Sequence, residues 1–423
     1  MLRARNRADC MFGLIIDRPV ATVAFVLATL AATTVVAFAL ARRLAVSDFL
    51  MDAPSGRSNH RRPTARSGGV AVFLAWLLAC YALSFLGRQS PWPAAFGAFA
   101  SVAIPAFLLG LADDWRPISA SRRLFYQVAV ASMFALTFGA LEVAPSPFGG
   151  TVELGVFGPV LTVFWIVAFM NAYNFMDGAN GLAGFAGLVG ACAIAVGAGL
   201  GGDGSTALLA LALAAAILGF LPVNFPSGRI FLGDGGSMSI GFALAALAVM
   251  AARIDGALMS PLFAPIVFMP LLFDVALTLV SRGLRGQRLS EAHSEHAYQV
   301  LIRSGLSHAK VATLYFALTA MCAICAFAAL RLPAQGQWAV VIVVAIALAP
   351  AHLGLQALGV RRGLIAVPAG RPAWRTRRRR RRTTVIATAP VELAAASPGF
   401  RNGDLHADES DMAERGALQR AAE

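Results

Sequence analysis

Long apolar runs separated by short polar loops restrict the fold of this chain more than any other feature. We place eleven runs of about 17–25 apolar residues, the length that a helix needs to cross a bilayer. They lie at 19–41, 68–87, 94–112, 122–141, 157–175, 181–200, 205–223, 236–253, 259–280, 310–331 and 337–357. Polar and apolar residues do not alternate with a period of two, which excludes an outer-membrane β-barrel. The runs predict an all-α polytopic membrane protein with about 11 transmembrane helices.

Composition supports this fold class and suggests two regions. Hydrophobic residues make up 58% of the chain and charged residues 13%, whereas soluble chains have about a quarter charged residues. Residues 1–357 form the predicted transmembrane catalytic domain, and residues 358–423 have the Arg-rich and then mixed-charge composition of a disordered tail. The first run is too long for the apolar region of a signal peptide, so we expect it to be retained. The five cysteines have no spacing that suggests a disulfide framework.

Arginine placement predicts the orientation of the chain in the membrane. Arginines concentrate in alternate loops and in the tail, so the positive-inside rule places these loops and the C-terminus in the cytoplasm. Arg3, Arg5, Arg7 and Arg18 oppose this orientation, unless the later loops dominate or translation begins at Met11. Much of the net charge of +13 comes from the tail, which suits anionic inner-leaflet lipids better than nucleic acid.

Five polar segments interrupt the apolar pattern, and all of them fall in loops predicted to be cytoplasmic. A charged side chain at membrane depth costs free energy, so carboxylates at the ends of spans need a function or a partner. The segments are DAPSGRSNHRRPTARSGG (52–69), LLGLADDW (108–115), NAYNFMDGANGL (171–182), NFPSGRIFLGDGGSM (224–238) and SEAHSEHAYQVLIRSGLSH (290–308). Taken singly, each also has a structural interpretation as an anchor, a helix end, a packing stripe, a tight turn or a solvated helix.

The first two segments contain arginines and paired acids. Arg61 and Arg66 lie on a loop rich in turn residues, and a guanidinium fork matches phosphate oxygens. Asp113 and Asp114 are adjacent at the end of the third run and point to different helix faces. A divalent cation or a shared proton would relieve their repulsion.

The third and fourth segments combine amides, acids and glycines. Asn171, Asn174 and Asp177 are spaced i, i+3 and i+6, so we expect them on one face of a helix end. In the fourth segment Asp234 lies among glycines, which let a backbone approach a phosphate closely. A carboxylate in that setting can hold Mg²⁺ on its way to a diphosphate.

The fifth segment carries two histidines, His293 and His296, that we expect to share a helix face, with Arg303 and His308 nearby. The pattern lacks further Cys or His ligands and differs from HExxH, which argues against zinc. Phosphate binding or acid/base work is favoured, and we expect affinity for an anionic donor to strengthen as the pH falls through about 6.5.

Together, these groups suit the joining of a water-soluble phosphorylated donor to a lipid acceptor. Two anionic phosphates must meet at the membrane surface, and Mg²⁺, or Mn²⁺ in its place, can bridge diphosphate oxygens and stabilise the leaving phosphate. The residues alone therefore predict phosphoryl or phospho-sugar transfer.

The five segments, in this order over about residues 45–310, resemble the polyprenyl-phosphate N-acetylhexosamine-1-phosphate transferases of glycosyltransferase family 4. The form of the fifth segment is most similar to the branch that initiates O-antigen or related polysaccharide synthesis. The resemblance implies a multi-pass protein of the bacterial inner membrane with a cytoplasmic active site. It also implies undecaprenyl phosphate as acceptor and a UDP-N-acetylhexosamine as donor. The sugar, the choice between direct transfer and a covalent enzyme intermediate, and the oligomeric state, monomer or homodimer, stay open.

The resemblance also implies catalytic roles. Asp113 and Asp114 match the paired aspartates linked to acceptor activation and metal chemistry, with Asp114 as a second metal residue. Asp234 matches the aspartate of the FxGDxGS motif, which is the expected Mg²⁺ ligand. His293 and His296 match the histidine motif that approaches the donor diphosphate.

The implied substrate-binding residues come from the third and fourth segments, with Arg61, Arg66 and Arg303 as candidates for the phosphates. Asn174 and Asp177 match the NxxDG motif of the nucleotide-sugar site, and Asn224 and Phe231 match positions near the uracil. Asn180 stands where the family usually has an aspartate, so its amide would have to bind the uracil.

Two other classes compete with a transferase. A transporter of an anionic substrate would also contain polar groups and helices broken by Gly and Pro, but it predicts acids near the bilayer midplane and an internal repeat. An intramembrane aspartyl protease could use Asp114 and Asp234 as a dyad, but Phe231 occupies the first glycine position of its GxGD signature.

Overall fold

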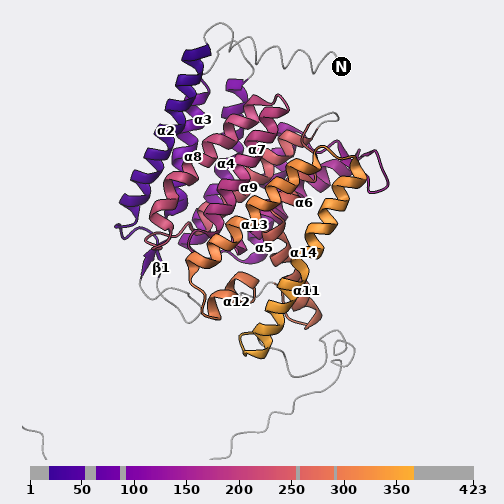
Figure 1. The fold of residues 1–423 in the computed structure, drawn as a ribbon. Coiled ribbons are helices and arrows are strands. Elements are labelled where there is room, and N and C mark those ends of the chain that lie inside the picture. Colours follow the sequence, from indigo (N-terminus) through magenta and orange to yellow (C-terminus); the bar gives the residue numbers. More distant parts are fainter. Residues whose placement is uncertain (1–18, 53–62, 86–91, 254–257, 290–292, 366–423) are drawn as a thin grey trace, which may run out of the picture. The chain divides into compact units, whose positions relative to one another are not determined.

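The computed structural model describes residues 19–52, 63–85, 92–253, 258–289 and 293–365. Arg61 and most of the tail lie outside the described residues. The helices are α2 (Pro19–Leu44), α3 (Gly68–Leu83), α4 (Trp92–Trp115), α5 (Ala120–Phe138), α6 (Phe157–Phe175), α7 (Leu182–Leu200), α8 (Gly204–Asn224), α9 (Gly233–Ala252), α10 (Phe263–Val267), α11 (Met269–Leu284), α12 (Ala297–Arg303), α13 (His308–Ala329) and α14 (Ala334–Arg361) (Figure 1). Two small antiparallel hairpins pair β1 (Met51–Asp52) with β2 (Thr64–Ala65) and β3 (Val143–Pro145) with β4 (Thr151–Glu153). The all-α polytopic class is confirmed.

A helix coincides with each expected apolar run in the described part of the chain. Eight of these helices are long and apolar enough to cross a membrane: α2, α4, α6, α7, α8, α9, α13 and α14. Helices α3 and α11 are shorter, and α5 carries Arg122 and Arg123 in its first turn. The ninth run is divided between α10 and α11 at Phe268, because Pro270 supplies no backbone N–H and restricts the residue before it. The total of eleven spans stays a prediction.

Helix α9 lies in the middle of the bundle and packs against α3, α4, α6 and α7 (Figure 1). Small residues permit this packing. A Cβ at Gly69 would lie 2.2 Å from the Gly236 backbone, and one at Gly110 would lie 2.2 Å from the Asp234 carbonyl oxygen. Close approach of this kind is how membrane helices gain packing contacts without a hydrophobic driving force. This close approach brings the first turn of α3 and the C-terminal part of α4 against the start of α9.

Helices α2 and α14 bury the smallest share of their apolar residues. Exposed side chains on α2 include Val20, Leu27 and Val35, and those on α14 include Ile342 and Ile346. Apolar surface of this extent on a spanning helix suits contact with lipid. These two helices therefore form the periphery of the bundle.

Backbone pairing holds the first polar loop against the fourth. Phe231 N donates to Ala65 O (2.8 Å), and Gly68 N donates back to Phe231 O (2.8 Å). Gly69 N then donates to Leu232 O (2.7 Å). Segments more than 150 residues apart in sequence thus become neighbours at one end of the bundle.

Candidate active site

A cavity of about 1100 Å³ opens at this end of the bundle. Its charged lining consists of Arg42, Arg43, Arg66, Arg229, Asp177 and Asp234, and its polar lining includes Thr64, Asn174, Asn180, Asn224, Gln299 and His308, with Phe231 beside them. Seven of the predicted site residues therefore face one space: Arg66, Asn174, Asp177, Asn180, Asn224, Phe231 and Asp234. Arginines and acids together suit a phosphorylated ligand that brings a cation with it.

Asp234 stands in the first turn of α9. Gly233 precedes it with φ of +75°, a conformation that side chains rarely adopt, and this turn lets α9 start beside the first loop. Asn174, in the last turn of α6, donates from Nδ2 to Asp234 Oδ1 (2.7 Å) and to Ser237 Oγ (2.8 Å). The carboxylate is thus oriented by a neighbouring helix at the wall of the cavity.

The paired aspartates do point apart, as expected, and each has its own partners. Asp114 accepts hydrogen bonds from Asp234 N (3.0 Å) and Gly235 N (2.8 Å), so it caps the N-terminus of α9 from another helix. Asp113 accepts from Ile118 N (2.6 Å) and pairs with Arg123 (3.0 Å). Neither lines the cavity. Their direct part in the chemistry stays a prediction, while their support of the surrounding backbone is visible.

Asp177 is the second cavity-lining acid. Burial raises the pKa of its carboxyl well above the usual range, and the nearby Asp234 and Asp114 carboxylates raise it further, against a lowering effect of Arg66. None of the described residues donates a hydrogen bond to it. Asp177 and Asp234 both line the cavity, so Asp177 is a further candidate metal residue, and the metal role expected of Asp114 stays a prediction.

The two acids fit an ion of the Mg²⁺ type but do not form a complete metal cage. Among the described residues, no three Cys, His, Asp or Glu side chains converge on one point. Mg²⁺ is commonly held by one or two carboxylates, with water and substrate phosphates as the remaining ligands. The donor set of this site matches that pattern.

Two asparagines shape the far wall of the cavity. Asn224 accepts from Gly181 N (2.6 Å) and donates to Ile230 O (2.8 Å), so both ends of its amide join the third segment to the fourth. Asn180 donates weakly from Nδ2 to Pro226 O (3.4 Å), and its backbone N donates to His308 Nδ1 (3.3 Å). Of the two, Asn180 keeps its amide oxygen available for a ligand.

The expectation of a shared face for Asn171, Asn174 and Asp177 is wrong. Helix α6 ends at Phe175, so Asp177 lies in the turn beyond it. Asn171 pairs with Gln127 on α5, away from the cavity. Residues i and i+3 are about 60° apart on a helix. Asn171 therefore makes a packing contact with α5, while Asn174 lines the cavity.

The expected helix face for His293 and His296 is also wrong. Residues 293–295 have no regular structure, and His296 is the N-cap of α12. The two rings are still neighbours, with centroids 4.9 Å apart. Neither histidine lines the cavity, and Arg303 instead donates to Ser294 O (3.1 Å) and Leu364 O (2.8 Å).

The pKa of His293 is lowered to about 4, first by burial and then by the neighbouring His296, Arg282 and Arg285. It is therefore neutral near pH 6.5. The expected strengthening of donor binding at that pH cannot come from this residue.

Three arginines and two other large polar residues line the cavity although they were not among the predicted site residues: Arg42, Arg43, Arg229, Gln299 and His308. Arg42 and Arg43 end α2, and the positive-inside rule already explains arginines there. Arg229 and His308 lie in two of the polar segments, and this placement was the sequence signal that could have identified them. Gln299 is an ordinary helix residue by sequence, and only the fold brings it to the cavity.

Comparison with known proteins decides the family. The profile of Glycosyl transferase family 4 matches residues 96–252. Over 287 residues the chain is 31% identical to the probable undecaprenyl-phosphate N-acetylglucosaminyl 1-phosphate transferase of Bacillus subtilis, covering 68% of this chain and 78% of that protein. It is 35% identical over 294 residues to the decaprenyl-phosphate N-acetylglucosaminephosphotransferase of Mycobacterium tuberculosis (strain ATCC 25618 / H37Rv), covering 62% and 71%. The chain belongs to the polyprenyl-phosphate N-acetylhexosamine-1-phosphate transferase family.

A 29% identical relative in Yersinia pestis is an undecaprenyl-phosphate alpha-N-acetylglucosaminyl 1-phosphate transferase, matched over 67% of this chain and 78% of that protein. Membership of this family makes the protein a membrane phospho-sugar transferase. It argues against the alternative interpretations as a transporter or an aspartyl protease. The matched region, 96–252, contains Asn174, Asp177, Asn224 and Asp234. The cavity is thus built largely from the part of the chain that carries the family resemblance.

Proposed function

We propose that this protein transfers an N-acetylhexosamine 1-phosphate, with N-acetylglucosamine 1-phosphate as the first candidate, from its UDP-sugar to undecaprenyl phosphate. The products are UMP and a lipid-linked sugar that starts an O-antigen or exopolysaccharide on the cytoplasmic face of the bacterial inner membrane. The observation that carries the proposal is a cavity with four arginines and two carboxylates at one end of a bundle of apolar helices. The names of the relatives supply the polyprenyl-phosphate acceptor and the sugar.

The reaction exchanges one phosphoanhydride for another. An oxygen of the acceptor phosphate attacks the β-phosphorus of the UDP-sugar, and the bond from that phosphorus to the bridging oxygen breaks. UMP leaves with the electron pair of that bond. Catalysis of such a transfer rests mainly on positioning and on stabilisation of phosphate charge.

The lining residues can divide this work. Arg66 and Arg229 reach the cavity from two loops and can hold the donor diphosphate, while Phe231 offers a ring for the uracil. Asp234 and Asp177 would hold Mg²⁺, which supplies charge neutralisation at the diphosphate when bound. Asn174 keeps Asp234 turned towards the cavity.

A physical route leads the acceptor to the same cavity. Arg42 and Arg43 end α2, a helix that exposes most of its apolar side chains, and both line the cavity. A polyprenyl chain in the bilayer beside α2 would bring its phosphate towards these two guanidinium groups. Both substrates could then meet in one space.

The test is UMP release from purified protein in nanodiscs that contain undecaprenyl phosphate, with a panel of UDP-N-acetylhexosamines. We expect UDP-N-acetylglucosamine to be turned over and Arg229→Gln to raise the donor KM at least about tenfold, as loss of a charge-assisted contact would. The matched control is Arg331→Gln, which changes an exposed arginine beyond the other end of α13. Absence of UMP release with every donor, from correctly inserted protein, would contradict the proposal.

A further inference from the structure

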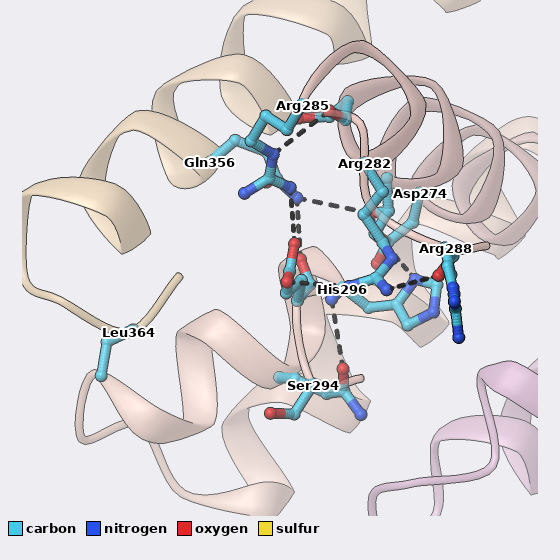
Figure 2. A network of polar contacts seen from close by, with 12 residues as sticks. Asp274, Arg282, Arg285, Arg288, Ser294, His296, Gln356 and Leu364 are labelled. Carbon is cyan, nitrogen blue, oxygen red and sulfur yellow. Dashed lines mark hydrogen bonds and ion pairs between the residues drawn. The ribbon is translucent and has the colours of Figure 1, made fainter. Parts of the chain in front are cut away.

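A second polar network lies beside the cavity, around the buried carboxylate of Asp274 on α11 (Figure 2). Tyr315 donates to it from its hydroxyl (2.7 Å) and Ala297 from its backbone N (2.8 Å). Tyr298 N lies at a longer distance (3.4 Å). One acid thus fixes the start of α12 to α11 and α13, although it lines no part of the cavity.

The same carboxylate faces His296. Asp274 Oδ1 lies 3.5 Å from His296 Nδ1, and both side chains are almost completely buried. Nδ1 has no hydrogen-bond partner of standard geometry in the described part of the chain, but the backbone N–H of Gln299 also faces the His296 side chain in a capping box. The only other histidine beside this oxygen there, His352 on α14, is farther from it (3.8 Å). The carboxylate is the acceptor available to a proton on Nδ1, whereas the Gln299 N–H would favour an unprotonated Nδ1.

The position of His296 connects this network to the reaction site. Its ring stacks on Phe175, with centroids 5.8 Å apart and planes inclined by 30°. Phe175 follows Asn174, the residue that orients Asp234. Tyr298, two residues after His296, donates from its hydroxyl to Phe175 O (3.0 Å). The imidazole thus packs on the residue that follows Asn174 and lies two positions before Asp177 in the chain.

Helix α14 supports the loop that carries this histidine. Gln356 donates to Glu295 O (2.8 Å), next to His296. The Glu295 carboxylate is held in turn by Arg282 (2.9 Å) and by Arg285, both at the end of α11 (Figure 2). The loop before α12 is therefore fixed from two sides, and the remaining freedom of His296 is mainly its ring orientation and tautomer.

We propose that Asp274 is a positioning residue for the transfer reaction, acting through His296. Its carboxylate holds the proton on Nδ1, so that Nε2 is the basic nitrogen presented by the ring. A carboxylate that accepts from one imidazole nitrogen fixes the tautomer and the orientation of the ring. This inference rests on the proposed function, because it assigns His296 a part in that reaction.

The test combines kinetics with nitrogen spectroscopy. Asp274→Asn and His296→Gln should each lower kcat/KM about 10- to 100-fold, the usual effect of losing an orienting partner, and should change the same parameter, kcat or KM. In the His296→Gln background, Asp274→Asn should add less than about a threefold loss, because residues that act as a unit are not additive. Full additivity of the two losses would overturn the proposal.

A matched control separates positioning from stability. Tyr315→Phe removes another partner of Asp274 but leaves the His296 contact, so it should lower the melting temperature while kcat/KM stays within about threefold. Equal losses of activity for Tyr315→Phe and Asp274→Asn at matched thermal stability would mean that the role of Asp274 is only structural.

The tautomer itself can be measured without turnover. With ¹⁵N-labelled histidine, the His296 signal, assigned by its absence in His296→Gln, should show a protonated Nδ1 in the parent protein and in Tyr315→Phe, and a changed tautomer in Asp274→Asn. An unchanged signal in Asp274→Asn would refute the positioning role. Absence of turnover in the parent protein, with the tautomer change intact, would instead count against the proposed function and leave the contact established.

Discussion

Replacing Asp114 by asparagine removes the carboxylate that caps the start of α9. In the folded chain its two oxygens accept from Asp234 N at 3.0 Å and from Gly235 N at 2.8 Å. An asparagine oxygen can replace one of these acceptors, but the side-chain NH₂ then faces the other backbone N–H. One buried donor is left without an acceptor, beside the residue that we expect to bind the metal.

The size of the effect follows from these two contacts. An unsatisfied buried N–H costs about 1–3 kcal/mol, and removing a negative charge from a helix N-terminus costs about 0.3–1 kcal/mol more. We therefore expect Asp114→Asn to destabilise the protein by about 3 kcal/mol, to lower its melting temperature by about 5 °C or more, and to reduce turnover through displacement of Asp234. The assays are thermal unfolding in detergent and UMP release in nanodiscs.

Asp113→Asn is the matched control on the adjacent residue. Its oxygen can still accept from Ile118 N, and it loses mainly the ion pair with Arg123, which is partly exposed. Such pairs contribute roughly 0–1 kcal/mol, so the control should unfold close to the parent temperature. A normal melting temperature for Asp114→Asn together with abolished turnover would refute this reasoning, because it would show that Asp114 acts on the substrate and not on the backbone of α9.

Four other predictions test the metal ligand, His293, the contact between Gly178 and Tyr298, and the tail. Asp234→Asn should insert normally but lose most of its Mg²⁺-dependent turnover, and full activity in EDTA would contradict the metal assignment. Since the pKa of His293 is lowered to about 4, its imidazole is almost entirely uncharged above about pH 5. The ratio of kcat/KM between the parent and His293→Gln should then be constant from pH 6 to 8, and a step near pH 6.5 would show that His293 titrates there. In Gly178→Ala the new Cβ would lie 2.1 Å from Tyr298 Oη, so kcat/KM should fall at least about tenfold, and parent-like kinetics would mean that this contact is dispensable. Deleting residues 371–423 should leave kcat unchanged and should weaken binding to anionic vesicles only at low salt. The reason is that salt screens the attraction between charges beyond about 8–10 Å. An inactive truncated enzyme would place the tail in the active site.

Spacing and composition were sufficient to predict helical structure in each apolar run that the structure describes. An apolar run of about 20 residues has few stable conformations in a bilayer other than a helix, because every backbone N–H must be bonded within the segment. The same constraint makes polar side chains at helix ends conspicuous. Asp177, Asn174 and Asp234 could therefore be selected before any contact was known, and the structure brings them to one cavity.

Side-chain partners could not be read in the same way. Adjacent Asp113 and Asp114 look alike in sequence, yet one caps α9 and the other pairs with Arg123. The histidines have helical spacing but precede the helix, because α12 begins only at Ala297.

Asp274 illustrates what the sequence determines and what depends on the tertiary structure. The sequence places it inside an apolar run, which marks it as a carboxylate that needs partners. Apart from Thr278 on the same helix, its partners come from α12 and its N-cap, from α13 and from α14, between 22 and 78 residues further along the chain. Local pattern determines which segments become helices, because backbone hydrogen bonding within a bilayer is satisfied locally. Which side chains meet depends on how the helices pack and on where each one ends, and only the folded chain determines those two quantities.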